Sequence, residues 1–358
     1  MKTRKIKIGN RVIGGGAPVL IQSMCNTKTD DIEGTIRQTL ELERAGCDII
    51  RVAVPDMSAA EALKEIKKNI HIPLVADIHF DYRLAIIAME NGADKIRLNP
   101  GNIGGKENIK KVVDVAKERK IPIRIGVNSG SLERDILRKY GGVTARGMVE
   151  SAQKNIDLLQ EFNFDDIVVS LKASNPKLNF ESYRMMSAGS QFPLHVGVTE
   201  AGTVENGKIK SAVGIGALLL LGIGDTIRVS LTGDPLNEIK VAKSILEAAG
   251  LHLSPIEMIS CPTCGRTGVD LSKIAEEIEK AMKEIAEKRS QKGMRPLKVA
   301  VMGCEVNGPG EAKDADLGVA CGKGKGAIFI NGKIVKTVDE RQIKSTILDM
   351  VEHYEEYI

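Results

Sequence analysis

The sequence predicts an α/β protein in which an N-terminal (β/α)8 TIM barrel is followed by a small α/β domain. Between residues 17 and 249, short β-branched apolar runs alternate eight times with segments of helical periodicity. After Gly250 this alternation gives way to a different series of strands and turns. The 358 residues suffice for one large barrel and a further domain of about a hundred residues. We therefore expect domains at residues 1–252 and 253–358.

The eight barrel strands are predicted from near-continuous apolar runs, the pattern of a parallel sheet buried on both faces. They read APVLIQSMC, CDIIRVAVP, IPLVADIHF, ADKIRLNPGN, IPIRIGVNSG, DIVVSLKAS, PLHVGVTEAG and DTIRVSLTGDP. Each precedes a helical segment, such as residues 30–45 or 236–249. Eight such pairs favour a closed barrel over a doubly wound open sheet. No GxGxxG stands between the first strand and the first helix, which weakens the open-sheet alternative further.

The region after residue 252 is predicted to form a second, smaller sheet. Its strands read IEMIS, LKVAVMGC, AKDADLGVAC, GAIFI and KIVKTV. Asn331-Gly332 between the last two is typical of a type I′ hairpin turn. One charged helix is expected at about residues 270–288, and a terminal helix from Asp339 onward.

Composition excludes several classes of protein. A net charge of +4, aromatic residues at 3% and the absence of Trp argue against a nucleic-acid partner. The basic N-terminus is not followed by an apolar run long enough for a signal peptide, and no stretch approaches a membrane span. We expect a cytoplasmic protein whose six cysteines are reduced thiols rather than disulfides.

Polar residues are concentrated where the predicted barrel strands end, which is where barrel enzymes place their chemistry. They are Arg51, Asp77, His79, Arg97, Asn99, Asn102, Arg124, Asn128, Lys172, His195, Glu200, Arg228 and Ser230. Four arginines and a lysine at one mouth would repel one another without an anion, and their geometry suits a diphosphate. The Gly-rich segments at 99–105 and 211–216 are predicted as turns that add N–H donors at helix starts. The alternative is that each arginine pairs with an acidic neighbour.

Two cysteine motifs indicate a metal site. CPTCGR contains Cys261 and Cys264, spaced so that two thiolates reach one metal site, and MGCEVNGPGEA adds Cys304. Three thiolates favour iron–sulfur or zinc over magnesium or calcium. A fourth cysteine in an equivalent motif is absent, so the last position falls to a weaker ligand. Cys25 and Cys47 are expected in the core, and Cys321 is left open between ligand and core residue.

Taken together, these segments resemble the GcpE (IspG) family of 4-hydroxy-3-methylbut-2-en-1-yl diphosphate synthases. The resemblance runs from GGGAPVLIQSM through ADIHF, IRLNPGNIG, RIGVNSGSLE, HVGVTEAG, SAVGIG and DTIRVSLT to CPTCGR and MGCEVNGPGEA. Their joint order, and the last two motifs above all, are specific to the family. No insert-sized segment separates the eighth barrel helix from the cysteine motifs, so the chain matches the compact two-domain form.

The resemblance implies an oxidoreductase of the methylerythritol phosphate (MEP) route of isoprene biosynthesis. Its C-terminal domain would hold a [4Fe–4S] cluster on Cys261, Cys264 and Cys304, with Glu311 as an exchangeable fourth ligand. The reaction would open and dehydroxylate 2-C-methyl-D-erythritol 2,4-cyclodiphosphate with two electrons to give 4-hydroxy-3-methylbut-2-enyl diphosphate.

The resemblance also implies roles for the residues of the mouth. Arg51, Arg97, Arg124 and Lys172 would clamp the diphosphate, supported by Asn128, His195, Arg228 and Ser230. Glu200, with Asp77 and His79, is expected to supply the proton for the departing hydroxyl. Asn307, close to the cluster motif, would steer the substrate hydroxyl.

Partners also follow from the resemblance. Reduced flavodoxin or ferredoxin would deliver electrons, since no nicotinamide fingerprint is visible. A homodimer is implied in which the cluster domain of one subunit caps the barrel of the other, although closure within one chain meets the same need.

Two rival interpretations start from the same residues. In one, the barrel is a pterin- or corrinoid-type methyltransferase and the cysteines hold a structural zinc ion. In the other, the C-terminal domain is a zinc ribbon that binds nucleic acid or a partner protein. The ribbon interpretation lacks its second CxxC, a basic stripe and accompanying aromatic residues.

Overall fold

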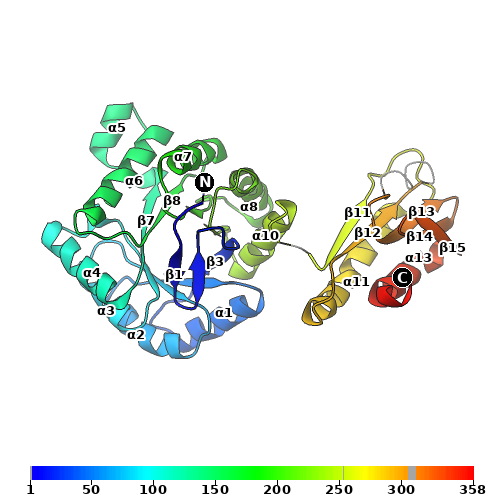
Figure 1. Ribbon diagram of the computed structural model, residues 1–358, viewed down its shortest axis with the longest axis horizontal. Coiled ribbons are helices and arrows are strands. Elements are labelled where there is room, and N and C mark those ends of the chain that lie inside the picture. The colour runs from blue at the N-terminus through cyan, green and yellow to red at the C-terminus, as the bar shows by residue number, and fades with distance from the viewer. Residues whose placement is uncertain (1, 253, 305–311) are drawn as a thin grey trace. The chain divides into compact units, whose positions relative to one another are not determined.

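The computed structural model describes residues 2–252, 254–304 and 312–358. The chain divides into two compact units, Met1–His252 and Leu253–Ile358, shown in Figure 1. Within the described residues, no helix combines the length and the apolar character that crossing a bilayer requires.

The first unit contains a barrel of eight parallel strands, and the predicted fold class is confirmed. Its strands are β3 (Leu20–Met24), β4 (Ile49–Ala53), β5 (Leu74–Asp77), β6 (Lys95–Arg97), β7 (Ile123–Asn128), β8 (Ile167–Lys172), β9 (His195–Val196) and β10 (Thr226–Ile227). Strands β3 to β8 pair in chain order, and β10 pairs with both β3 and β9. A parallel bridge between Val169 and Leu194 joins β8 to the residue before β9. This bridge closes the circle and excludes the open doubly wound sheet.

Helices surround the barrel strands (Figure 1). They are α1 (Ile32–Arg44), α2 (Met57–Lys68), α3 (Tyr82–Glu90), α4 (Lys106–Arg119), α5 (Arg134–Tyr140), α6 (Ala145–Gln160), α7 (Pro176–Gly189), α8 (Val204–Ser211), α9 (Ala217–Leu220) and α10 (Pro235–Ala248), with short 3-10 turns η1 (Pro100–Asn102) and η2 (Ser129–Ser131). Six of them begin after an Asp, Asn or Thr whose side chain accepts a backbone N–H of the first turn, namely Asp31, Asp56, Asp81, Thr144, Asn175 and Asp234. Such caps fix where each helix starts after its strand. They therefore define the loops that form the mouth of the barrel.

One sequence-based expectation about these loops is wrong. The segment SAVGIG at 211–216 is not a turn at a helix start. It lies inside continuous helix, where a π-helical segment, η3 (Ala212–Gly216), joins α8 to α9. A Cβ atom on Gly214 would lie 2.5 Å from Cγ2 of Val198. Gly214 therefore allows the helix to pack closely on the barrel. The backbone N–H groups of residues 211–216 belong to the helix and are not donors at a helix start.

A hairpin missed by the sequence analysis covers the amino-terminal end of the barrel. It consists of β1 (Ile6–Ile8) and β2 (Arg11–Ile13), paired antiparallel. Three hairpin isoleucines form one buried cluster with residues at the starts of barrel strands, namely Ile6, Ile8, Ile13, Ile49, Val75 and Val168. Water is thus excluded from that end, and the polar mouth lies at the opposite end.

The second unit is a five-stranded mixed sheet with two long helices. Its strands are β11 (Ile256–Ser260), β12 (Leu297–Met302), β13 (Leu317–Gly322), β14 (Lys325–Ile330) and β15 (Lys333–Asp339), in that order in the sheet. The first three are parallel and the last two antiparallel. Helices α11 (Leu271–Gln291) and α13 (Glu340–Glu352) pack on the sheet, and a 3-10 turn, η4 (Tyr354–Glu356), follows. The predicted hairpin turn is present, with φ of 48° at Asn331 and 76° at Gly332.

Candidate active site

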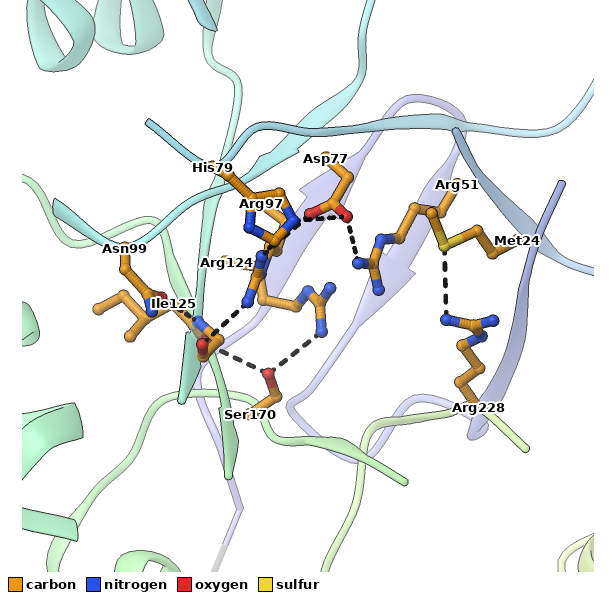
Figure 2. A network of polar contacts seen from close by, with 11 residues as sticks. Met24, Arg51, Asp77, His79, Arg97, Asn99, Arg124, Ile125, Ser170 and Arg228 are labelled. Atoms are coloured by element: carbon orange, nitrogen blue, oxygen red, sulfur yellow. Dashed lines mark hydrogen bonds and ion pairs between the residues drawn. The ribbon is translucent and has the colours of Figure 1, made fainter. Parts of the chain in front are cut away.

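Alternation along the barrel strands brings basic side chains into the interior. Lys95 and Arg97 on β6 share one face, whereas Ile96 between them belongs to the core under the helices. Arg97 is in register with Asp77 of β5 on one side and with Arg124 of β7 on the other. Neighbouring strands therefore place Asp77 beside Arg97 and a second arginine, Arg124, on the other side of Arg97; Figure 2 shows these side chains together.

Asp77 is the centre of one network in the mouth (Figure 2). Nη2 of Arg51 donates to Oδ2 of Asp77, and Nη1 of Arg97 lies 3.3 Å from Oδ1. Nε2 of His79 lies 3.5 Å from Oδ2. Burial by itself would raise the pKa of Asp77, but Arg51, His79 and Arg97 outweigh it and hold that pKa well below its usual range. The carboxylate form of Asp77 is therefore favoured, and this carboxylate contacts two arginines of the mouth.

Arg124 and Arg228 have weaker partners. Nη1 of Arg124 donates to the Ser170 hydroxyl at 3.1 Å, and that hydroxyl donates to the carbonyl of Ile125. Among the described residues, Arg124 has no carboxylate within ion-pair distance. Nε of Arg228 lies 3.6 Å from Oε2 of Glu238, on α10, while its Nη1 contacts the sulfur of Met24. Neither guanidinium is neutralised by a close bidentate carboxylate.

A cavity of about 110 Å³ lies among these side chains. It is lined by Arg51, Arg97, Arg124, Gly126, Asn128, Ser170, Lys172, Thr199, Arg228 and Ser230. A Cβ on Gly126 would lie 2.6 Å from Nε of Arg97. Glycine at that position therefore leaves room for the Arg97 guanidinium, whose Nη2 donates to the Gly126 carbonyl at 3.1 Å.

Buried nitrogen atoms without a hydrogen-bond partner accumulate in this part of the barrel. Among the described residues they are Nε2 of Gln22, Nε of Arg51, Nε and Nη2 of Arg124, Nε2 of His195 and Nε of Arg228. Buried donors are normally satisfied. Basic side chains also outnumber acidic ones here. Asp77 and Glu238 are the two carboxylates among the described residues of this region, and the six basic side chains are Arg51, Lys95, Arg97, Arg124, Lys172 and Arg228. Both observations point to an anion as the ligand.

A second, larger cavity of about 230 Å³ adjoins the first through two shared residues, Arg97 and Asn128. Its lining also includes His79, Phe80, Asn99 and Asn102, among others. Phe80 is 74% exposed although it is a large apolar residue. Amides beside an apolar ring suit the carbon and hydroxyl part of a small ligand.

His195 and Glu200 lie apart from this cavity lining. His195 is fully buried, and its Nδ1 lies 2.8 Å from the Thr226 hydroxyl. Burial, then Arg124, Lys172 and Lys95, lower its pKa well below the usual value. Glu200 follows β9, is exposed and has φ of 52°, a strained backbone for a residue other than glycine. Neither residue lines the cavities described above.

Sequence reasoning missed several residues of the site. Ser170 and Thr199 line the cavity, Glu238 contacts Arg228, and Lys95 lies deeper in the barrel. Ser170 and Lys95 are each two residues before a predicted site residue on the same strand. The two-residue repeat of a strand could therefore have found them.

Cys261 and Cys304 lie after the carboxyl ends of two neighbouring strands of the second sheet. Cys261 follows β11 and Cys304 follows β12, and these strands are parallel neighbours with Ser260 opposite Val301. The N–H of Gly303 donates to Sγ of Cys261 at 3.2 Å. Cys261 is half-buried, Cys264 exposed and Cys304 buried. Cys321 lies in the core, where burial raises its pKa to about 12, with smaller contributions from Glu340 and Cys261.

Thiolates from Cys261, Cys264 and Cys304 suit iron–sulfur or zinc better than magnesium or calcium. The donated N–H at Cys261 is also the kind of hydrogen bond that tunes cluster thiolates. Asn307 and Glu311 lie outside the described residues.

Comparison with known protein families matches both units. Residues 3–243 match the GcpE TIM-barrel domain, and residues 257–353 match the GcpE protein C-terminal domain. Among solved structures, the barrel resembles a Plasmodium falciparum HPPK-DHPS protein with a TM-score of 0.50 and 12% identity, over 69% of this chain and 50% of that one. Identity at that level shows the barrel fold alone.

Curated relatives match along nearly the whole chain. A Caldanaerobacter subterraneus subsp. tengcongensis protein named 4-hydroxy-3-methylbut-2-en-1-yl diphosphate synthase (flavodoxin) is 61% identical over 98% of this chain and 96% of its own. Proteins of the same name from Clostridium acetobutylicum and Geobacillus kaustophilus are 54% and 56% identical, each over 99% of this chain and over 99% and 93% of their own. With both of its domains matched and identities above one half, the chain belongs to the GcpE family.

Proposed function

We propose that this chain reduces 2-C-methyl-D-erythritol 2,4-cyclodiphosphate to 4-hydroxy-3-methylbut-2-enyl diphosphate in the MEP route of isoprene biosynthesis. The observation that carries the proposal is the barrel cavity, where Arg51, Arg97, Arg124, Lys172 and Arg228 converge. Membership of a family whose curated members are named for this product supports a diphosphate as the ligand of the cavity.

The anion-binding half of the proposal rests on charge and geometry. Guanidinium groups match phosphate oxygens through paired N–H donors. Arg124 is 1% exposed and keeps two unpartnered N–H positions, at Nε and Nη2. A diphosphate supplies acceptors for several such donors at once. The neighbouring cavity lined by His79, Phe80 and Asn99 would hold the carbon chain.

The overall reaction changes the number of electrons in the substrate and the charge of its diphosphate. Two electrons and one proton enter, and water leaves. The bond between carbon 2 and its phosphate oxygen breaks, and that oxygen stays on phosphorus with the bonding electron pair. The hydroxyl on carbon 3 leaves with the proton as water, and a double bond forms between carbons 2 and 3. The linear product therefore carries one more negative charge on its diphosphate than the cyclic substrate.

A [4Fe–4S] cluster on Cys261, Cys264 and Cys304, with Glu311 as exchangeable ligand, would supply the electrons and a Lewis-acidic iron. The chain's own residues position the substrate. Asp77 orients Arg51 and Arg97 toward the cavity. Glu200, with Asp77 and His79, would supply the proton for the departing hydroxyl, and Asn307 would steer that hydroxyl.

The electron donor and the assembly belong to the same proposal. The names of the relatives specify flavodoxin, and a ferredoxin has the same chemistry. The family relationship implies a homodimer, in which the cluster domain of one subunit caps the barrel of its partner. The methyltransferase and zinc-ribbon alternatives gain no support, because the family matches cover both units.

An anaerobic assay with the cyclodiphosphate and reduced flavodoxin tests the proposal. We expect the reconstituted protein to form the linear diphosphate, identified by mass spectrometry. Lys172→Met and Cys264→Ala should each abolish turnover, because one removes a basic side chain of the cavity and the other a thiolate. Lys110→Met, on the surface of α4, and Cys321→Ala, in the core of the second unit, should retain it. Absence of product with a fully loaded wild-type cluster would sink the proposal.

A further inference from the structure

Lys95 is a buried lysine that the reaction described above does not use. It belongs to β6 and has no exposed surface. Its Nζ donates to Oε1 of Gln22 on β3, at 3.2 Å. Strands β5 and β4 separate β6 from β3 in the sheet, so this side chain spans the barrel interior. It lies one inward position below Arg97, toward the closed end.

The surroundings of Lys95 contain no counter-charge. Among the described residues, no carboxylate lies within ion-pair distance of its Nζ, in contrast to Arg51, Arg97 and Arg228. The groups that face it from the other strands are Gln22 on β3, Arg51 on β4, Val75 on β5, Arg124 on β7 and His195 on β9. Two of these are cations, one is a neutral imidazole and one a neutral amide.

An ammonium group in such a place is unfavourable. Burying a charge without a partner costs several kcal/mol, and like charges nearby add to the cost. Burial first, then Arg124 and Arg51, lower the pKa of Lys95 well below its usual value. Burial first, then Arg124, Arg228 and Arg51, also lower the pKa of Lys172 well below its usual value, but there Glu238 opposes the shift, whereas among the described residues no carboxylate opposes it at Lys95.

An anion bound in the cavity reverses this balance. A diphosphate among Arg51, Arg97 and Arg124 cancels the charges that oppose protonation of Lys95. Ring opening then adds one further negative charge to that diphosphate. A protonated amine beneath the arginines would stabilise the added charge, because electrostatic interactions are strong in a dry interior.

We propose that Lys95 is a neutral amine in the anion-free barrel and takes up a proton from solvent when a diphosphate binds above it. It then acts as a positioning charge beneath the arginines and favours the more highly charged, ring-opened diphosphate. This inference rests on the proposed function, in that it takes the barrel ligand to be a diphosphate.

Calorimetric titration of the holoenzyme with the cyclodiphosphate, without reductant, tests proton uptake. Each phosphate of this ligand is bonded to one carbon oxygen and to the bridging oxygen, so it keeps a single strongly acidic group and the ligand does not titrate near neutral pH. The binding enthalpy measured in buffers of different ionisation enthalpy gives the number of protons taken up. We expect the wild type to take up about one proton more than Lys95→Met. Equal uptake by both proteins would overturn the inference.

Lys95→Met is suited to this test because methionine fills the space of the lysine chain without its charge. We expect it to fold and to melt at or above the wild-type temperature, since an unpaired buried amine is removed. Lys110→Met, which removes an exposed lysine paired with Asp114, serves as the matched control and should take up protons like the wild type. If Lys95→Met does not fold, Lys95→Gln replaces it, with the same expectation.

Two further outcomes separate this inference from the proposed function. If the wild type does not bind the cyclodiphosphate, the proposed function fails, and inorganic pyrophosphate then tests Lys95 as a partner of bound anions. If the cyclodiphosphate binds, affinities for substrate and product are compared. Lys95→Met should lose about tenfold more affinity for the linear product than for the cyclic substrate, because the product carries the extra charge. Equal losses would contradict the role in ring opening.

Discussion

At the scale of single residues, the arrangement of the mouth depends on Asp77. Among the described carboxylates, it alone contacts two arginines of the cavity. The sequence places Asp77 at the end of its strand, but the strand register that sets it beside Arg97 appears only in the fold. Lys95 illustrates the same limit, because a lysine in an apolar run does not reveal what faces it across the barrel.

Replacing Asp77 by Asn tests its role as counter-charge. The folded-state pKa of Asp77 lies below its unfolded value. Its stabilisation is therefore present above the unfolded pKa and lost as the pH falls below it. At neutral pH we expect Asp77→Asn to lower the free energy of unfolding by about 3 kcal/mol, because the buried guanidinium of Arg97 and the partly buried one of Arg51 lose their charged partner. Urea unfolding at neutral and acidic pH measures the difference, which should shrink in acid.

The matched control is Asp135→Asn, which affects only a surface ion pair with Lys154. It should leave the unfolding curve unchanged at both pH values. An Asp77→Asn protein as stable as the wild type at neutral pH would contradict the role assigned to this carboxylate.

His195 is predicted to stay neutral across the neutral pH range. Burial and the nearby cations lower its folded-state pKa, so its stabilising effect is fully present above the unfolded pKa and is lost as the pH falls below it. Nitrogen-15 NMR of the imidazole rings should show a single neutral tautomer for His195. In the same spectra His353, whose pKa is raised mainly by a hydrogen bond to the Asp349 backbone, should titrate. Titration of His195 near its ordinary pKa would contradict the dry, cationic interior.

At the scale of elements, the alternation of apolar strands with amphipathic helices and the turn residues were sufficient to predict most of the fold. The eight strand positions, the type I′ turn at Asn331-Gly332 and both helices of the second unit were predicted correctly. The β1–β2 hairpin was missed because its strands are three residues long and basic residues interrupt them. The segment SAVGIG was misassigned because glycine in a tightly packed helix and glycine in a turn look alike in sequence.

The loop that carries Cys261 and Cys264 is held in place by backbone packing at Gly268. The N–H of Gly268 bonds to the Gly303 carbonyl. A Cβ at Gly268 would lie 2.6 Å from the backbone nitrogen of Lys323, whereas one at Gly265 would meet nothing within 4 Å among the described residues. We expect Gly268→Ala to lower the melting temperature of the cluster-free protein by several degrees. Gly265→Ala is the control and should not lower it, and equal melting temperatures would refute the packing argument.

At the scale of the whole molecule, the proposed reaction needs the cysteine edge of one unit and the cavity of the other in the same active site. A mixed-dimer experiment determines whether they come from one chain or two. Lys172→Met chains are combined with Cys264→Ala chains, each inactive alone. Capping between subunits predicts recovery of up to about a quarter of wild-type turnover for random pairing. Closure within one chain predicts no recovery, and that result would refute the dimeric active site.

The family assignment, the barrel and the basic mouth could be reached from sequence because each rests on local patterns. The partners across the barrel could not, since they depend on strand register and on how far each side chain reaches. The ligands of the proposed cluster could be predicted from sequence only in part. Spacing placed Cys261 beside Cys264, but only the parallel pairing of β11 and β12 brings Cys304 to the same edge.

The central claim is that this chain performs reductive chemistry on an iron–sulfur cluster. The most direct measurement is iron, acid-labile sulfide and zinc per chain in protein purified without oxygen. About four iron and four sulfide per chain, without zinc, is the predicted result. Stoichiometric zinc with no iron, persisting after anaerobic reconstitution, would contradict the claim.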